Sequence, residues 1–165
     1  MSLTTRGAGN GTGAGPAADG EDYASELDGY MFEDLEVGMT AIYSRTVTES
    51  DIVLFCGISG DTNPIHLDRE YAARTQFGGT IAHGMLSASF ISTVIGTKLP
   101  GPGAIYVSQN CRFKAPVRAG DTVVARVTVI ELTPEKKRAR LDTTCSIGAK
   151  VVIDGEAVVM VPSRG

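Results

Sequence analysis

The stretch GMLSASFISTVIGTK, residues 84–98, gives the main evidence for the fold predicted from this sequence. Its residues are apolar around nearly the whole circumference of a helix, and many of them are small. A helix of this kind is buried, with other elements packed closely around it. At about 1.5 Å per residue it is about 20 Å long, the width of a small domain. Pro100 and Gly101 mark its expected end, because these residues stop helices.

Strand patterns follow this helix. They cover residues 104–115, 122–132, 138–147 and 150–161. In the third segment Ala139, Leu141, Cys145 and Ile147 alternate with polar residues, which is typical of an antiparallel strand with one solvated face. We expect a meander of four strands, with a bulge at Gly155 in the last one.

Shorter elements precede the helix. Residues 39–48 predict a first strand, and residues 49–58 predict a helix that Thr48 or Ser50 can cap. A polar loop then leads to His66, and Asp68 can cap a short helix through Arg74. This order of elements predicts an α+β fold in which an antiparallel sheet of about five strands wraps around the long central helix.

The first 28 residues have a different composition from the rest. They are rich in Gly, Ala, Thr and Asp and show no apolar periodicity, so they cannot bury enough surface to fold. We predict a flexible, glycine-rich acidic tail over residues 1–28 and a single domain over residues 29–165. Residues 1–38 carry eight acidic and one basic residue, a net charge of −7, so a chain of net charge −4 leaves +3 for the remainder. That remainder suits an anionic ligand but is too weakly basic for nucleic acid.

Location and redox state follow from what the sequence lacks. No apolar run approaches the ~18 residues that span a bilayer. The first thirty residues show no basic start followed by an apolar stretch, so a secretory signal is not expected. We therefore predict a cytoplasmic protein that does not bind membranes. Cys56, Cys111 and Cys145 are widely spaced and form no CxxC pair, which predicts free and mostly buried thiols.

The candidate chemistry lies in the sequence GDTNPIH, residues 60–66. Asn63-Pro64 forces a turn that can fold Asp61 back beside His66. A carboxyl group and an imidazole that converge on one water can supply both the base and the acid that hydration of a conjugated double bond needs. Taken alone, Asp61 is better explained as a turn residue and His66 as a structural histidine. A metal site on His66 and His83 is disfavoured, because the two lack helical spacing and no cysteine pair joins them.

Gly84 opens the central helix. A helix N-terminus offers free N–H groups and the positive end of the helix dipole, so a carbonyl oxygen docked there would find an oxyanion hole. A glycine needed only for close packing is the alternative, and it is compatible with that role. Ser87, Ser89 and Ser92 lie on the same helix, where small polar residues usually just permit packing.

This motif resembles that of the MaoC-like dehydratases and, within them, the (R)-specific enoyl-CoA hydratases of the hot-dog fold. The likeness runs from about Tyr30 to Pro162, and the segments that carry it are residues 60–68, 81–86, 113–117, 120–121 and 155–159. The resemblance implies reversible syn addition of water to a trans-2-enoyl-CoA, giving an (R)-3-hydroxyacyl-CoA. It assigns Asp61 and His66 as the catalytic pair and the Gly84 N–H as the donor to the thioester carbonyl. Ser92 and Asn63 are expected to support the site.

The resemblance also implies partners and rivals. It implies a homodimer or a larger assembly, no metal, and no cofactor, because CoA is part of the substrate. One rival is a dehydratase that acts on an acyl-carrier-protein thioester or a dicarboxyl-CoA. A second is a hot-dog domain that binds acyl-CoA without turning it over. A third is a thioesterase, which the arrangement of Asp61 and His66 around Asn63-Pro64 disfavours.

Overall fold

The computed structural model describes residues 26–165. Residues 1–25 of the predicted tail therefore lie outside the described part of the chain. The main chain joins the domain at Gly29, whose N–H donates to the carbonyl of Pro102, and at Tyr30, whose N–H donates to the carbonyl of Pro100. The elements that follow are a 3₁₀ turn η1 (Phe32–Asp34), β1 (Thr40–Thr46), α2 (Glu49–Ser59), α3 (Pro64–Leu67), α4 (Arg69–Ala73), α5 (Gly84–Thr97), β2 (Ile105–Gln109), β3 (Arg112–Phe113), β4 (Thr122–Thr133), η2 (Pro134–Lys136), β5 (Arg138–Ile147) and β6 (Lys150–Met160).

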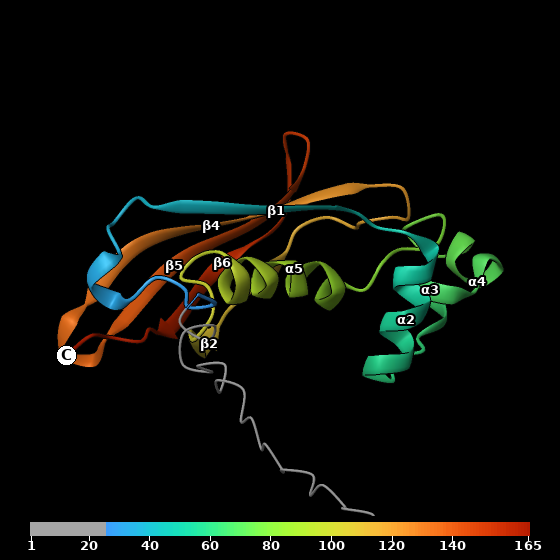
Figure 1. Cartoon of the computed structure of the whole chain (residues 1–165). Helices are drawn as coiled ribbons and strands as arrows, with labels where there is room; N and C mark the ends of the chain where they lie inside the picture. Colours follow the sequence, from blue (N-terminus) through green and yellow to red (C-terminus); the bar gives the residue numbers. More distant parts are fainter. Residues whose placement is uncertain (1–25) are drawn as a thin grey trace, which may run out of the picture.

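The sheet is antiparallel throughout and curves around α5 (Figure 1). Its order is β1-β4-β5-β6-β2, and β3 also pairs with β6. The expected α+β class and the sheet of about five strands are confirmed, since β2 and β3 divide the single predicted strand 104–115. The predicted four-strand meander is wrong in one respect. Only β4, β5 and β6 form a meander, whereas β2 pairs with β6 and β1 pairs with β4.

The bulge in β6 lies at a different place from the one predicted. The register between β5 and β6 shifts where Cys145 faces Ile153 and Ser146 faces Val151, which leaves Val152 as the extra residue. Val152 and Ile153 are consecutive and both buried, because a bulge turns two neighbouring side chains to the same face. Gly155 is regularly paired. It is glycine because a Cβ there would lie 2.0 Å from the Asn110 carbonyl oxygen.

Helix α5 crosses the concave face of the sheet and forms the centre of the core (Figure 1). Ile91, Val94 and Ile95 are at most 1% exposed. Its other face departs from the expectation of a helix buried all round. A stripe along that face is exposed in the single chain, and it consists of Met85, Ser89, Ser92 and Gly96.

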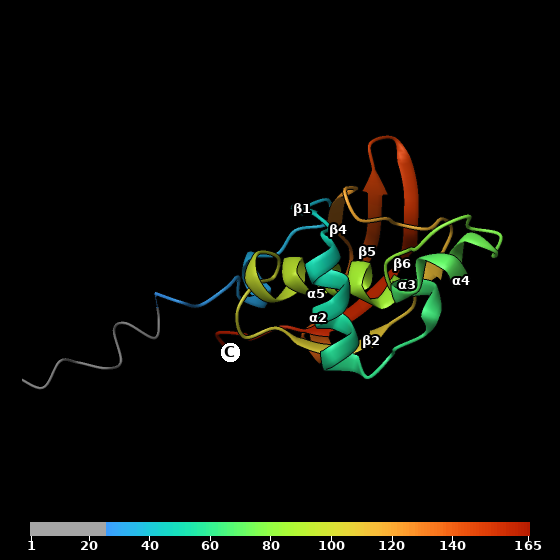
Figure 2. The same cartoon turned by 90° about the vertical axis from the view of Figure 1, so that its right-hand side faces the viewer.

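The short helices α2, α3 and α4 gather beyond the N-terminal end of α5 (Figures 1 and 2). Thr48 caps α2, since its side chain accepts a hydrogen bond from the Asp51 N–H. The predicted cap at Asp68 is confirmed, because it accepts from the Tyr71 N–H at the start of α4. The predicted loop from Ser59 to His66 is partly wrong. Asn63 caps the helical turn α3, so His66 lies on a helix.

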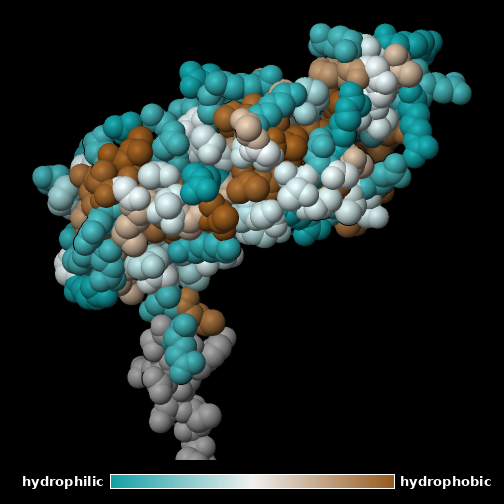
Figure 3. Space-filling view, turned by 90° about the horizontal axis from the view of Figure 1, so that it is seen from above, coloured by the Kyte–Doolittle hydropathy of each residue, from teal (hydrophilic) through white to brown (hydrophobic). Residues whose placement is uncertain are grey.

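Among residues 26–165, no helix combines the length and the apolar character needed to cross a bilayer. On the face seen in Figure 3, apolar residues gather in patches between hydrophilic ones. The predicted thiols are free, with Cys56 and Cys145 buried and Cys111 half-buried.

Candidate active site

Asp61 and His66 come together as their spacing predicts. A carboxylate oxygen of Asp61, a ring nitrogen of His66 and a ring nitrogen of His83 all lie within 4.8 Å of one another. The turn between the pair closes through the Asn63 N–H, which donates to Oδ1 of Asp61 at 3.2 Å. Asp61 is thus a turn residue as well as a candidate catalytic one, and its side chain is held toward His66.

The orientation of the His66 ring defines which nitrogen can act. Nδ1 lies 2.8 Å from the carbonyl oxygen of Ile81. A carbonyl only accepts, so Nδ1 carries the proton and donates it. Nε2 is then left with its lone pair, and His66 has the tautomer that a general base requires.

His83 is also a member of this site, although its place in the sequence suggested only a disfavoured metal ligand. It lies immediately before α5 and is 2% exposed. Its ring stacks on that of His66 with a centroid separation of 3.6 Å. Its Nε2 lies 2.9 Å from the backbone carbonyl of Asp61. The available signal was that the only two histidines of the chain flank the two candidate elements of the site.

The Gly84 N–H is available as predicted. Gly84 is the first residue of α5, so its N–H has no acceptor within the helix. The ring of Phe113 covers this position closely, and a Cβ on Gly84 would lie 2.6 Å from the ring carbon Cε1. Close packing against Phe113 explains why this residue is glycine, and the oxyanion role of its N–H stays a prediction.

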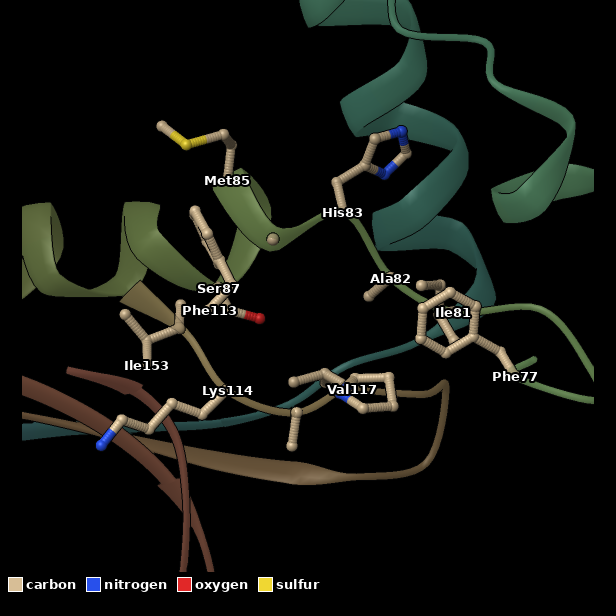
Figure 4. Close-up of a pocket in the computed structure, with 13 residues that line it drawn as sticks. Phe77, Ile81, Ala82, His83, Met85, Ser87, Phe113, Lys114, Val117 and Ile153 are labelled. Carbon is tan, nitrogen blue, oxygen red and sulfur yellow. The ribbon is translucent and has the colours of Figure 1, made fainter. Parts of the chain in front are cut away.

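A cavity of about 390 Å³ opens beside Gly84 (Figure 4). It is bordered mostly by apolar side chains, among them Phe77, Ile81, Val117 and Ile153. The hydroxyl of Ser87 points into it, is buried and has no hydrogen-bond partner among the described residues (Figure 4). An apolar cavity with a few polar groups at one end is typical of a small-molecule site.

Asn63 and Ser92, the two residues expected to support the site, lie in different parts of the structure. Asn63 lies in the site, where its Oδ1 accepts from the Ile65 N–H and begins α3. Ser92 lies on α5 eight residues beyond Gly84, about 12 Å along the axis at 1.5 Å per residue. It is on the exposed stripe and forms no hydrogen bond with Asp61 or His66 within residues 26–165. Its supporting role stays a prediction.

Cys145 is not a candidate nucleophile. Cys145 is buried beneath α5, and its Sγ lies 3.4 Å from the Ser87 carbonyl. Burial raises the pKa of the Cys145 thiol to about 12. A thiol that stays protonated is a poor nucleophile, so Cys145 acts as a core residue.

The same three side chains could be considered as metal ligands, but their geometry does not favour this. Ligand lone pairs lie in the imidazole planes, and the planes of His66 and His83 are stacked only 28° apart. Lone pairs that lie in two stacked, nearly parallel planes about one ring thickness apart do not readily meet at one metal ion, as a tetrahedral site requires. The arrangement suits proton transfer, and of the three side chains His83 is the one that borders the cavity.

Comparison with known proteins places this fold and site in a family. The sequence model of the MaoC like domain matches residues 34–153, more than half of the chain. The chain belongs to this family. A curated relative from Rhodospirillum rubrum, an (R)-specific enoyl-CoA hydratase, is 59% identical over 142 residues, which are 86% of this chain and 99% of the relative. A 3-hydroxybutyryl-CoA dehydratase from Methylorubrum extorquens is 57% identical over 139 residues, 84% of this chain and 88% of the relative.

A solved structure gives the same result. The unliganded R-hydratase from Pseudomonas aeruginosa has a TM-score of 0.77 and 47% identity, covering 82% of this chain and 88% of its own. The predicted hot-dog fold and the predicted hydratase and dehydratase class are thereby confirmed.

Proposed function

We propose that this chain is an (R)-specific enoyl-CoA hydratase, which adds water reversibly to a trans-2-enoyl-CoA and forms an (R)-3-hydroxyacyl-CoA. The observation that carries this proposal is the convergence of the Asp61 carboxylate and the His66 ring on His83, the residue that directly precedes Gly84 at the start of α5. The names of the relatives from Rhodospirillum rubrum and Methylorubrum extorquens support the substrate class and describe the two directions of one reaction.

Each group has a defined step. Nε2 of His66 takes a proton from water, and the water oxygen forms a bond to C3 of the substrate. The electron pair of the double bond moves toward C2 and the thioester oxygen, where the Gly84 N–H stabilises the charge that develops. The acid–base pair then returns a proton to C2, and Asp61 orients the water throughout. Delivery of both parts of water from the side of the pair gives syn addition.

The cavity beside Gly84 is the proposed site of the acyl chain. A thioester carbonyl at the Gly84 N–H places the acyl carbons among Phe77, Val117 and Ile153. These side chains bind by burying apolar surface, without fixing one chain length. We propose short acyl groups such as crotonyl as substrates, in keeping with the name of the Methylorubrum extorquens relative.

The test is hydration of crotonyl-CoA, followed by loss of the enone absorbance and by chiral chromatography of the product. We expect Asp61→Asn and His66→Ala each to lower kcat by the ~10²–10⁴-fold that a removed acid–base group costs. Substantial turnover by either variant would contradict the assignment. Leu67→Ala, at an exposed position on α3, serves as the matched control and should keep near-wild-type kcat.

The same assay separates the rival functions. Release of free CoA in place of hydroxyacyl-CoA would indicate a thioesterase. Tight binding without turnover would indicate an acyl-CoA-binding domain. A much higher kcat/KM with crotonyl on acyl carrier protein than with crotonyl-CoA would indicate a carrier-protein dehydratase.

We further propose that the reaction needs no metal or other cofactor, because an imidazole and a carboxylate supply the proton transfers. Prolonged treatment with a chelator, followed by desalting, should leave kcat for crotonyl-CoA unchanged. Loss of activity that zinc or another divalent cation restores would overturn this proposal and would reassign Asp61, His66 and His83 as ligands.

A homodimer in the cytoplasm is the proposed state of the protein. Within residues 26–165, strand β2 is a sheet edge with a partner on one side only, and Ile105, Tyr106 and Val107 are all exposed on it. An exposed apolar edge strand readily pairs with another chain. The exposed stripe of α5 is the second surface that a partner would cover.

A further inference from the structure

His83 lies at a helix position that its side chain does not serve. It is the N-cap residue of α5, where Ser, Thr, Asp or Asn normally accepts a backbone N–H. The His83 side chain makes no such capping bond. Its Nδ1 is buried and has no partner among residues 26–165. Helix capping therefore does not explain this histidine. A buried ring with an unpaired nitrogen also costs free energy, so another interaction of the ring must account for its presence.

His83 contacts both the turn that carries Asp61 and the ring of His66. Nε2 donates to the backbone carbonyl of Asp61 at 2.9 Å, so its proton lies on Nε2. This bond ties the turn that carries Asp61 to the start of α5. The face of the ring packs on His66 at a centroid separation of 3.6 Å and an interplanar angle of 28°. Phe55 of α2 contacts His83 as well, with a centroid separation of 5.0 Å.

These contacts complement those that His66 makes itself. The Nδ1 bond to the Ile81 carbonyl holds one edge of the His66 ring, but a single bond leaves the ring free to tilt about it. The stacked face of His83 removes that freedom. Ile81 and His83 are two residues apart on the segment that leads into α5, so the same segment positions both His66 and the Gly84 N–H.

We infer that His83 is a positioning residue, which joins the Asp61 turn, the His66 ring and the oxyanion donor at Gly84 into one rigid unit. The inference rests on the proposed function for its catalytic meaning. Its structural content does not, because the tautomers of the two histidines can be observed without substrate. Misplacement of reacting groups by about 1 Å can cost ~10²-fold in rate.

The first measurement uses the unmodified protein. Nitrogen-15 NMR of the two imidazoles should show the proton on Nδ1 in His66 and on Nε2 in His83, as neutral rings. An Nδ1-protonated neutral His83 would overturn the inference, since that tautomer cannot donate to the Asp61 carbonyl. This result is independent of whether crotonyl-CoA is the substrate.

The second measurement uses three variants with crotonyl-CoA. His83→Gln retains an N–H donor and should stay within about 10-fold of wild-type kcat. His83→Phe retains an aromatic face without a donor and should lose ~10²-fold in kcat, and His83→Leu should lose at least as much. KM should change little, because His83 is directed at protein groups. In the Leu variant His66 is the only histidine, and its ring signals should broaden because the ring can tilt about the bond to the Ile81 carbonyl.

Cys56→Ala is the matched control. It removes the sulfur that lies 3.6 Å from Nε2 of His83 but leaves the bond to Asp61, and kcat should stay near wild type. Thermal melting checks that each variant is folded. Near-wild-type kcat in a folded His83→Leu, or a raised KM with kcat unchanged, would contradict a positioning role. Loss of kcat in the control equal to that in His83→Phe would show that general packing explains the effect.

Discussion

His66 acquires its chemical character from a hydrogen bond that its own neighbours in sequence do not make. The carbonyl of Ile81, fifteen residues away, holds the proton on Nδ1 and leaves the lone pair of Nε2 free for its proposed role as the base. Asp61 acquires its direction from a local bond, the one from the Asn63 N–H. The pair therefore combines one residue oriented by its turn and one oriented by tertiary contact.

Gly84 permits a prediction at the level of a single Cβ. In Gly84→Ala the new carbon would lie 2.6 Å from the Phe113 ring, so the ring or the helix start must move. The N–H would then no longer face the thioester carbonyl. Removing an oxyanion donor typically costs ~10²–10³-fold, and we expect a fall in kcat of that size for crotonyl-CoA.

The double variant Gly84→Ala/Phe113→Ala is the control for this clash. It removes the ring that the added carbon would meet, so part of the lost kcat should return relative to Gly84→Ala. Unchanged kcat in Gly84→Ala would show that neither the close contact nor the N–H matters at this position.

Among the secondary-structure elements, α2 owes part of its stability to the capping of its first turn. Thr48 and Asp51 form a reciprocal capping box, in which the Asp51 N–H donates to the Thr48 hydroxyl and the Thr48 N–H donates to the Asp51 carboxylate. Removal of such a cap costs about 1 kcal/mol. We expect Thr48→Ala to lower the free energy of unfolding by about that amount, measured by urea denaturation. Ser50→Ala, outside the box, should change it far less.

The same carboxylate makes a prediction about pH. The Arg45 guanidinium and the Thr48 N–H lower the pKa of Asp51 from 3.8 to about 2. A carboxylate with a lowered pKa in the folded state stabilises the fold fully above its unfolded pKa. That contribution is lost as the pH falls through about 4 toward 2. Between pH 5 and pH 3 the free energy of unfolding should therefore fall more steeply in the wild type than in Asp51→Asn. Parallel slopes in urea titrations would contradict this.

At the scale of the whole molecule, β2 is the proposed edge between two subunits. Substitution of both Ile105 and Val107 by lysine places charge on this exposed edge and should yield a monomer by light scattering. Ile42→Lys, at a 42% exposed position on the opposite edge strand β1, should leave the dimer intact. A dimer in the first variant and a monomer in the second would place the interface on β1.

The sequence predicted the elements whose information is local. The bounds of β5 and the start of α5 follow from alternation and from the composition of residues 84–98. The partner of β2 was wrongly predicted, because strand pairing depends on which hydrogen-bonding edges meet and not on the strand's own residues. The predicted bulge at Gly155 is wrong because a glycine in a strand has the same local pattern whether it bulges or admits a neighbouring main chain.

Local sequence was enough to predict the sheet-forming segments, the buried central helix and the turn that brings Asp61 toward His66. Each rests on periodicity or on backbone preference over a few residues. Three features became visible only in the folded structure: His83 stacks on His66, Phe113 covers Gly84, and one face of α5 stays exposed. These contacts join residues that are distant along the chain, and their geometry is set by how the helix and the sheet pack together.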